Sequence, residues 1–334
     1  MAKYFFISFF ITSSIIFSQE NSNFNPSEYY ETNNDRLNVK FEIDNDIESF
    51  EYDNGISSYN IVPNSSLRTS VSAHTRFLTL RIGYAPNFLA SNDADDKGNT
   101  KVFKTNLDIF MKRWMQTIEL SSVKGYYIDQ IEGPGNILPP DDSKYFLLPE
   151  LKALRIRGVT SYKFNDHLSF KALYRQTDIQ KISTGSFIPS LTYQYLKLED
   201  KDSPESTKSF DIIINTGYYY TFVINNKWYT NLGLSPGLGY EFNKVTTGIP
   251  EGKAISKSNE VIFNINTLMG IGYNSKHFFS GINLRGIATT RDEQSLVQFN
   301  TVRGIFQLFV GYRFNTPKFV DRSFDWIEDQ NPLK

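Results

Sequence analysis

The sequence predicts an all-β fold, a single antiparallel transmembrane β-barrel of about 12 strands, with about 10 or about 14 strands as alternatives. Three observations support this prediction. Apolar and polar residues alternate in many segments, short and long connections follow one another, and aromatic residues gather near the short connections. Because side chains of a strand alternate between its faces, a membrane barrel turns an apolar face to lipid and a polar face to its lumen.

The stretch VIFNINTLMGIGY at 261–273 shows this alternation. Val261, Phe263 and Ile265 share one face, whereas Asn264 and Asn266 share the other. Glycines fall mostly on the polar face, where they leave room for long charged side chains, although glycine weakens an ordinary strand. A soluble, secreted β-sandwich binding protein would have the same period with its apolar face turned inward, so this alternative stays open. Further alternating segments lie at 37–43, 78–84, 106–111, 154–162, 232–241 and 306–313.

Two classes of connection link these segments. Short ones, rich in residues that tolerate positive φ, are expected at His74-Thr75, Lys112-Arg113, Asn165-Asp166, Asn225-Asn226 and Asn274-Ser275. Long polar ones are expected at about 85–100, 127–151, 244–257 and 291–298. Outer-membrane barrels have short periplasmic turns and long extracellular loops, and we predict the same arrangement here.

The region 167–224 lies between two expected short turns and should therefore hold an even number of strands. It shows three strand-like runs, at 168–177, 186–198 and 208–224. If 186–198 belongs to an outer loop or a long strand, the barrel has about 12 strands, and if a weak fourth strand is hidden, it has about 14.

The ends of the chain predict export. Residues 1–18 are expected to be a signal peptide, because Lys3 precedes an apolar run from Tyr4 to Phe17. Residues 19–36 are expected to be a polar linker, 37–314 the barrel and 315–334 a C-terminal periplasmic extension. We therefore expect the mature chain in the cell outer membrane, in contact with outer-membrane lipid and inserted by the barrel-assembly machinery.

Composition argues against several functions. The formal net charge is −1, so nothing favours nucleic acid as a partner, and the absence of cysteine excludes disulfides and thiolate metal sites. The histidines, His74, His167 and His277, are scattered near short turns, so we expect no metal site and no cofactor. Barrel enzymes need a histidine near the outer rim. We therefore expect no enzyme, with an outer-membrane barrel enzyme as the second alternative.

Charged residues dominate the strand faces that are predicted to point into the lumen. The basic candidates for the lumen lining are Arg81, Lys104, Arg155, Arg157, Lys171, Arg175, Arg285, Arg303 and Arg313, and the acidic ones are Asp108, Glu119 and Glu241. A basic lumen favours anions, so we expect passive, porin-like passage or binding of a small anionic solute, or else a structural or surface role. The other interpretation is an interior packed with paired charges. A possible recognition segment consists of Gln180, Lys181, Ser183, Thr184, Gly185 and Ser186.

Five short motifs together resemble a known family. They are Tyr59 with Pro63-Asn64, Asp96-Lys97-Gly98, KGYY at 124–127, QKISTGSF at 180–187 and the closing GYRF at 311–314. In this order they are similar to uncharacterised outer-membrane proteins of Bacteroidetes that are grouped as a domain of unknown function. That family more usually has alanine where this chain has Thr184. The resemblance implies an outer-membrane barrel without an established activity, and it transfers no catalytic residues, solute or protein partner.

Overall fold

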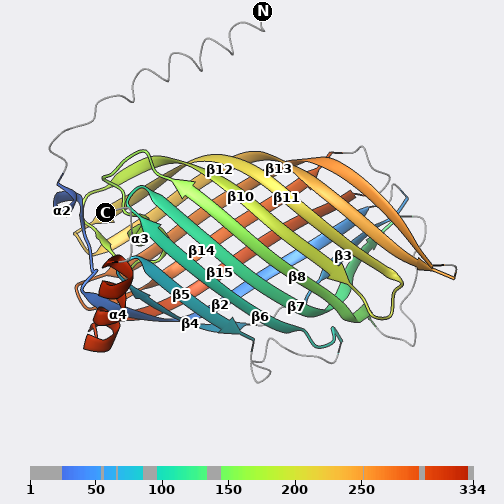
Figure 1. Ribbon diagram of the computed structural model, residues 1–334, viewed down its shortest axis with the longest axis horizontal. Coiled ribbons are helices and arrows are strands. Elements are labelled where there is room, and N and C mark those ends of the chain that lie inside the picture. The colour runs from blue at the N-terminus through green and yellow to red at the C-terminus, as the bar shows by residue number, and fades with distance from the viewer. Residues whose placement is uncertain are drawn as a thin grey trace, which may run out of the picture.

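The computed structural model describes residues 25–53, 56–64, 67–85, 96–133, 144–250, 252–292 and 298–329. Its main feature is a closed antiparallel ring in which the last strand pairs with the first long strand (Figure 1). The twelve strands of the ring are β2 (Arg36–Asp53), β4 (Arg68–Thr75), β5 (Leu78–Tyr84), β6 (Lys101–Met111), β7 (Trp114–Glu132), β8 (Phe146–Tyr162), β10 (Thr184–Glu199), β11 (Glu205–Ile224), β12 (Trp228–Ile249), β13 (Gly252–Asn274), β14 (Phe278–Arg291) and β15 (Gln298–Asn315). This confirms the predicted fold class and strand number.

Six further elements accompany the ring. They are α2 (Pro26–Tyr29), β1 (Tyr30–Glu31), β3 (Ser58–Val62), α3 (Phe170–Tyr174), β9 (Ile179–Gln180) and α4 (Lys318–Asp329). Within the described ranges, no helix combines the length and the apolar character needed to cross a membrane.

The apolar faces of the strands point outward. Phe263 is 53 % exposed, whereas its neighbour Asn264 is 4 % exposed. A soluble sandwich would bury the phenylalanine and expose the asparagine, so the sandwich alternative is wrong. An apolar outer wall with no free strand edge is the arrangement that lipid requires, because hydrocarbon cannot satisfy unpaired backbone groups. The chain is therefore an outer-membrane-type β-barrel.

The ring changes its strand number along the barrel. β4, β5 and β6 are short, and beyond their ends β3 pairs with β2 on one side and with β7 on the other. The ring thus has twelve strands near the short turns and ten near the opposite, extracellular end. We call the junction between the twelve-strand and ten-strand parts the step, and the segment 96–100 that covers it the strap. There Asn64 donates to the Gly98 carbonyl and Thr100 donates to the Gly125 carbonyl.

Beyond this step, the apolar side chains lie on the inner face of the barrel instead of the outer face. On β10, outward Tyr193 is followed towards the extracellular end by outward Lys197, whereas inward Gln194 is followed by inward Leu196. Side-chain alternation continues unbroken along the strand, so the reversal marks a change of surroundings from lipid to water. In the ten-strand part, buried Phe50, Val123, Tyr126, Ala153 and Leu196 form an apolar core inside the barrel.

The polar outer face of the strands beyond the step explains why two long loops were predicted in the wrong place. The expected loop at 244–257 is wrong, because β12 and β13 pair throughout it as far as Ile249 and Gly252. The expected loop at 127–151 is likewise too long, because β7 and β8 enter it from both ends. Strands that project into water are polar enough to resemble loops. Among the short turns, Lys112-Arg113 and Asn225-Asn226 are confirmed, whereas the first turn lies at Arg76-Phe77 instead of His74-Thr75. β13 includes Asn274, so the last turn begins one residue later than expected.

Residues 163–183 form an inward-folded segment, named here the plug. The predicted hairpin at Asn165-Asp166 and the predicted strand at 168–177 are both wrong, since this stretch contains α3 and turns. Leu168, Phe170 and Leu173 gave the stretch a strand-like pattern, but they are buried against the barrel interior. The run at 186–198 is β10, so the ring reaches twelve strands without a hidden one.

Both ends of the described chain meet the periplasmic rim. The predicted signal peptide lies outside the described residues. In the predicted linker, β1 pairs with β9 of the plug, and Thr316 of the extension donates to the Asp35 carbonyl. The extension continues as α4 beside the barrel mouth (Figure 1).

We expect Gly125→Ala to destabilise the step. Gly125 has a φ of +91°, and an added Cβ would lie 2.1 Å from the Asn99 carbonyl oxygen. The strained backbone and the clash should cost about 3 kcal/mol, measured as a lower urea midpoint for the loss of heat-modifiable migration on gels. Gly304→Ala is the control, because a Cβ there meets no described atom within 4 Å. An equal midpoint for both variants would contradict this account of the step.

Candidate functional site in a closed barrel

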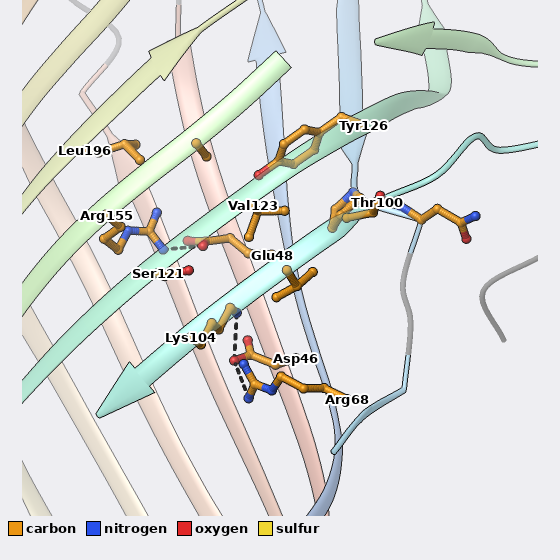
Figure 2. Close-up of a pocket in the computed structure, with 14 residues that line it drawn as sticks. Asp46, Glu48, Arg68, Thr100, Lys104, Ser121, Val123, Tyr126, Arg155 and Leu196 are labelled. Atoms are coloured by element: carbon orange, nitrogen blue, oxygen red, sulfur yellow. Dashed lines mark hydrogen bonds and ion pairs between the residues drawn. The ribbon is translucent and has the colours of Figure 1, made fainter. Parts of the chain in front are cut away.

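Strand β2 carries a ladder of four acidic side chains into the lumen. Glu42, Asp44, Asp46 and Glu48 lie at every second residue and therefore share the inward face. Each has a basic partner: Arg81 binds Glu42, Arg68 binds Asp44 (2.5 Å), Lys104 binds Asp46 (2.8 Å) and Arg155 binds Glu48. Figure 2 shows Asp46 between Lys104 and Arg68, and Arg155 directed at Glu48.

One guanidinium connects non-adjacent walls. Arg303 on β15 binds Asp46 on β2 at 2.8 Å and Glu119 on β7 at 2.7 Å. β2 and β7 do not pair directly at these residues, so the contacts cross the interior. Buried charges are tolerated only when they are paired, and these pairs fill the space between the walls. We call the β2 ladder, Glu119 and their basic partners the ion-pair belt.

Little space remains around the belt. One void is lined by Asp46, Arg68 and Tyr126, and another by Arg157, Gln194 and Asn264. Each measures about 20 Å³, which is room for about one water molecule. Nearer the extracellular end, Arg291 binds Glu241 at 2.6 Å. The described lumen is therefore a packed polar interior at this level.

The plug closes the periplasmic end. Wall side chains donate hydrogen bonds to its carbonyl oxygens: Asn231 to Leu173 (3.2 Å), Arg285 to Tyr174 (3.2 Å), Arg313 to Gln176 (2.8 Å) and Asn274 to Asp178 (2.9 Å). Arg175 of the plug binds Asp108 of β6 at 2.5 Å. These bonds satisfy carbonyl groups that burial would otherwise leave unpaired, and so they hold the plug in the mouth.

A larger cavity opens beside the plug at the periplasmic end. It measures about 260 Å³ and lies between the N-terminal segment, two periplasmic turns and the plug. Its charged lining consists of Arg76, Lys112, Lys163, Lys171 and Asp178, and we call it the periplasmic cavity. Three lysines against one carboxylate give it a cationic surface, whereas the fourth cation, Arg76, is already paired with Asp325 of α4 at 2.6 Å. Phe77, Phe110 and Phe170 supply apolar walls.

Burial shifts the pKa values of three charged groups that line this cavity. It lowers the pKa of Lys163 to about 8, against the opposing effect of nearby Asp166 and Asp178. Burial also lowers the pKa of Lys171 and raises the pKa of the Asp178 carboxyl. The Lys163 ammonium donates to the Leu168 carbonyl at 2.5 Å. Lys163 thus retains its charge near neutral pH, and both lysines are poorly hydrated, which favours an anionic partner.

The structure distributes the predicted charged residues over three places. Arg81, Lys104, Asp108, Glu119, Arg155, Arg157, Glu241, Arg285, Arg303 and Arg313 lie on strands with their side chains in the lumen, Arg175 lies in the plug, and Lys171 lies in the periplasmic cavity. The Arg157 guanidinium forms no hydrogen bond or ion pair with the described residues, but it borders only one of the small voids. The predicted basic lumen is thus largely neutralised by the β2 acids.

The possible recognition segment folds into the plug and its junction with β10. Gln180 donates to the Tyr29, His167 and Ile182 carbonyls, and Lys181 donates to the Ser27 carbonyl. Ser183, Thr184 and Ser186 accept from the Val223, Asn165 and Phe164 nitrogens, and Gly185 is buried. These polar groups bond to the chain itself at the periplasmic end.

The β2 acids are the residues of the candidate site that the sequence reasoning missed. The signal was present, because Glu42, Asp44, Asp46 and Glu48 share the phase opposite to apolar Phe41 and Ile43. Following the first alternating segment five residues further would have located them. The periplasmic cavity gave no such signal, since its residues come from four separate parts of the chain.

Comparisons with known proteins give one informative match. No curated protein matches the sequence. Similar solved structures include the outer membrane protease OmpT from Escherichia coli (7% identity, TM-score 0.36, 88% of this chain and 100% of that chain) and the toluene transporter TbuX from Ralstonia pickettii (9%, 0.30, 83% and 89%). Neither transfers an activity. The family model described as a domain of unknown function (DUF4421) matches residues 25–314, so the chain belongs to this family.

Proposed function

We propose that this barrel binds a small organic anion, a carboxylate or phosphate compound, in the periplasmic cavity. The observation that supports this most is the cavity of about 260 Å³ whose charged lining is three lysines, one carboxylate and Arg76, an arginine shared with the α4 carboxylates. A dianion of a few carbon atoms suits this volume and charge. The aromatic walls would exclude water from its apolar part and strengthen the ionic contacts.

Binding is a better proposal than passive passage. The ion-pair belt and the plug both occupy the path between the two ends of the barrel. The chain would then act as a membrane-anchored receptor that faces the periplasm. If the cavity binds no anion, the structural or surface role becomes the better account.

We also propose that the chain has no hydrolase activity. His74 is buried and hydrogen-bonded to Thr79 at 2.6 Å, and His167 stacks on Tyr29 with ring centroids 3.7 Å apart. His277 lies in the turn before β14. A histidine-dependent nucleophile would need these rings near a substrate at the outer rim. Loss of a lipase or protease activity on His→Ala substitution would overturn this proposal.

We expect Lys112→Asn to weaken binding of succinate at least about fivefold in titration calorimetry, since one cation of the cavity is lost. Asparagine suits this position because the backbone there has a φ of +46°. Lys276→Met, which removes an exposed lysine from another periplasmic turn, is the matched control. Equal affinities in all three proteins, or no heat of binding in the wild type, would contradict the proposal.

The affinity for succinate should fall as the pH rises from about 7 to about 9. Lys163 has a folded-state pKa of about 8, so it is cationic below this value and becomes neutral above it. Succinate is fully ionised across the range, so the change would report the protein. The measurement is calorimetry at constant ionic strength. A flat profile would show that Lys163 does not contribute to binding.

A further inference from the structure

Helix α4 has one apolar face and one acidic face. At 3.6 residues per turn, Phe319, Val320, Phe324 and Trp326 fall on one side of the helix. Asp321, Asp325 and Lys318 fall on the other. Phe319 is 73 % exposed and Trp326 is 66 % exposed, which places them among the most exposed large apolar side chains of the described chain. Two aromatic rings on one helix face are costly to leave in water.

The acidic face of α4 is fixed to the barrel rim. Arg76 in the β4–β5 turn binds Asp325 at 2.6 Å and Asp321 at 3.6 Å. The Phe77 ring meets the Phe324 ring edge-on, with centroids 5.4 Å apart. These contacts set the rotation of the helix about its axis. They hold Phe319 and Trp326 away from the turn, without a partner for either ring in the described chain.

The helix continues directly from the lipid-facing wall. Tyr312 and Phe314 at the end of β15 are about half exposed on the outer face and form part of the periplasmic aromatic girdle. Only Thr316 and Pro317 separate β15 from α4. Figure 1 shows α4 lying across the barrel axis at the rim, which is the direction of a helix parallel to the membrane plane.

We propose that α4 lies in the interface of the periplasmic leaflet, with Phe319 and Trp326 inserted among the phospholipid acyl chains. Aromatic residues at the level of the headgroups are the usual anchors of interfacial helices, and the apolar surface here is continuous with the girdle. Arg76, which holds α4 at the rim, also lines the periplasmic cavity. The proposal does not depend on whether the cavity binds an anion.

Fluorescence quenching in vesicles tests this proposal. The full chain carrying Trp114→Phe and Trp228→Phe retains Trp326 as its only tryptophan. It is reconstituted in phosphatidylethanolamine and phosphatidylglycerol vesicles whose acyl chains carry bromine either near the headgroup or near the chain end. We expect Trp326 to lose most of its emission with bromine near the headgroup, and less with bromine near the chain end.

A matched control places the single tryptophan on the extracellular side. In a chain that also carries Trp326→Phe and Ile56→Trp, the new ring replaces a 71 % exposed side chain of the ten-strand part and should not be quenched. Equal Trp326 emission in brominated and plain vesicles would overturn the proposal. An emission shift that depends only on protein concentration would also overturn it, because it would assign the apolar face to a second copy of the chain.

Discussion

The strict alternation of side chains along a strand is the constraint on which this structure depends. Each long strand passes from lipid into water, and its two faces cannot exchange places at the boundary. The residue types exchange instead, so that Tyr193 and Gln194 give way to Leu196 and Lys197 on the same two faces. The barrel thus has an apolar outer wall in its twelve-strand part and an apolar interior in its ten-strand part. The strap at 96–100 and Gly125 join the two parts where the exchange occurs.

The polar interior of the twelve-strand part follows from the same constraint. A barrel wall that gives its apolar residues to lipid leaves polar ones for the lumen, and charges there must be paired. Arg303, shared between Asp46 and Glu119, shows how pairing also closes the path across the barrel. The plug extends this closure to the periplasmic mouth, where wall side chains bind its carbonyl groups. A cationic cavity is left on the periplasmic side of the plug, and it is accessible without opening the barrel.

The periodicity of the sequence predicted the barrel, the outward direction of Phe263 and the inward direction of Asn264, because each depends only on local alternation. It failed where the surroundings change. The polar ends of β12 and β13 resemble loops once both faces meet water, and the plug residues Leu168 and Phe170 resemble a strand although they enter a short buried segment. The β2 acids were within reach of the same periodicity. The periplasmic cavity was not, because it forms only after closure brings Arg76, Lys112 and Lys171 together.

The central claim is that the charged interior is filled by its own pairs and by the plug. Conductance of the purified full chain in a planar lipid bilayer tests it most directly. Silence under applied voltage, with inserted protein confirmed by its heat-modifiable migration, is the predicted result. A steady, anion-selective current from the wild-type chain would show that ions pass Arg303 and the plug, and it would contradict the account.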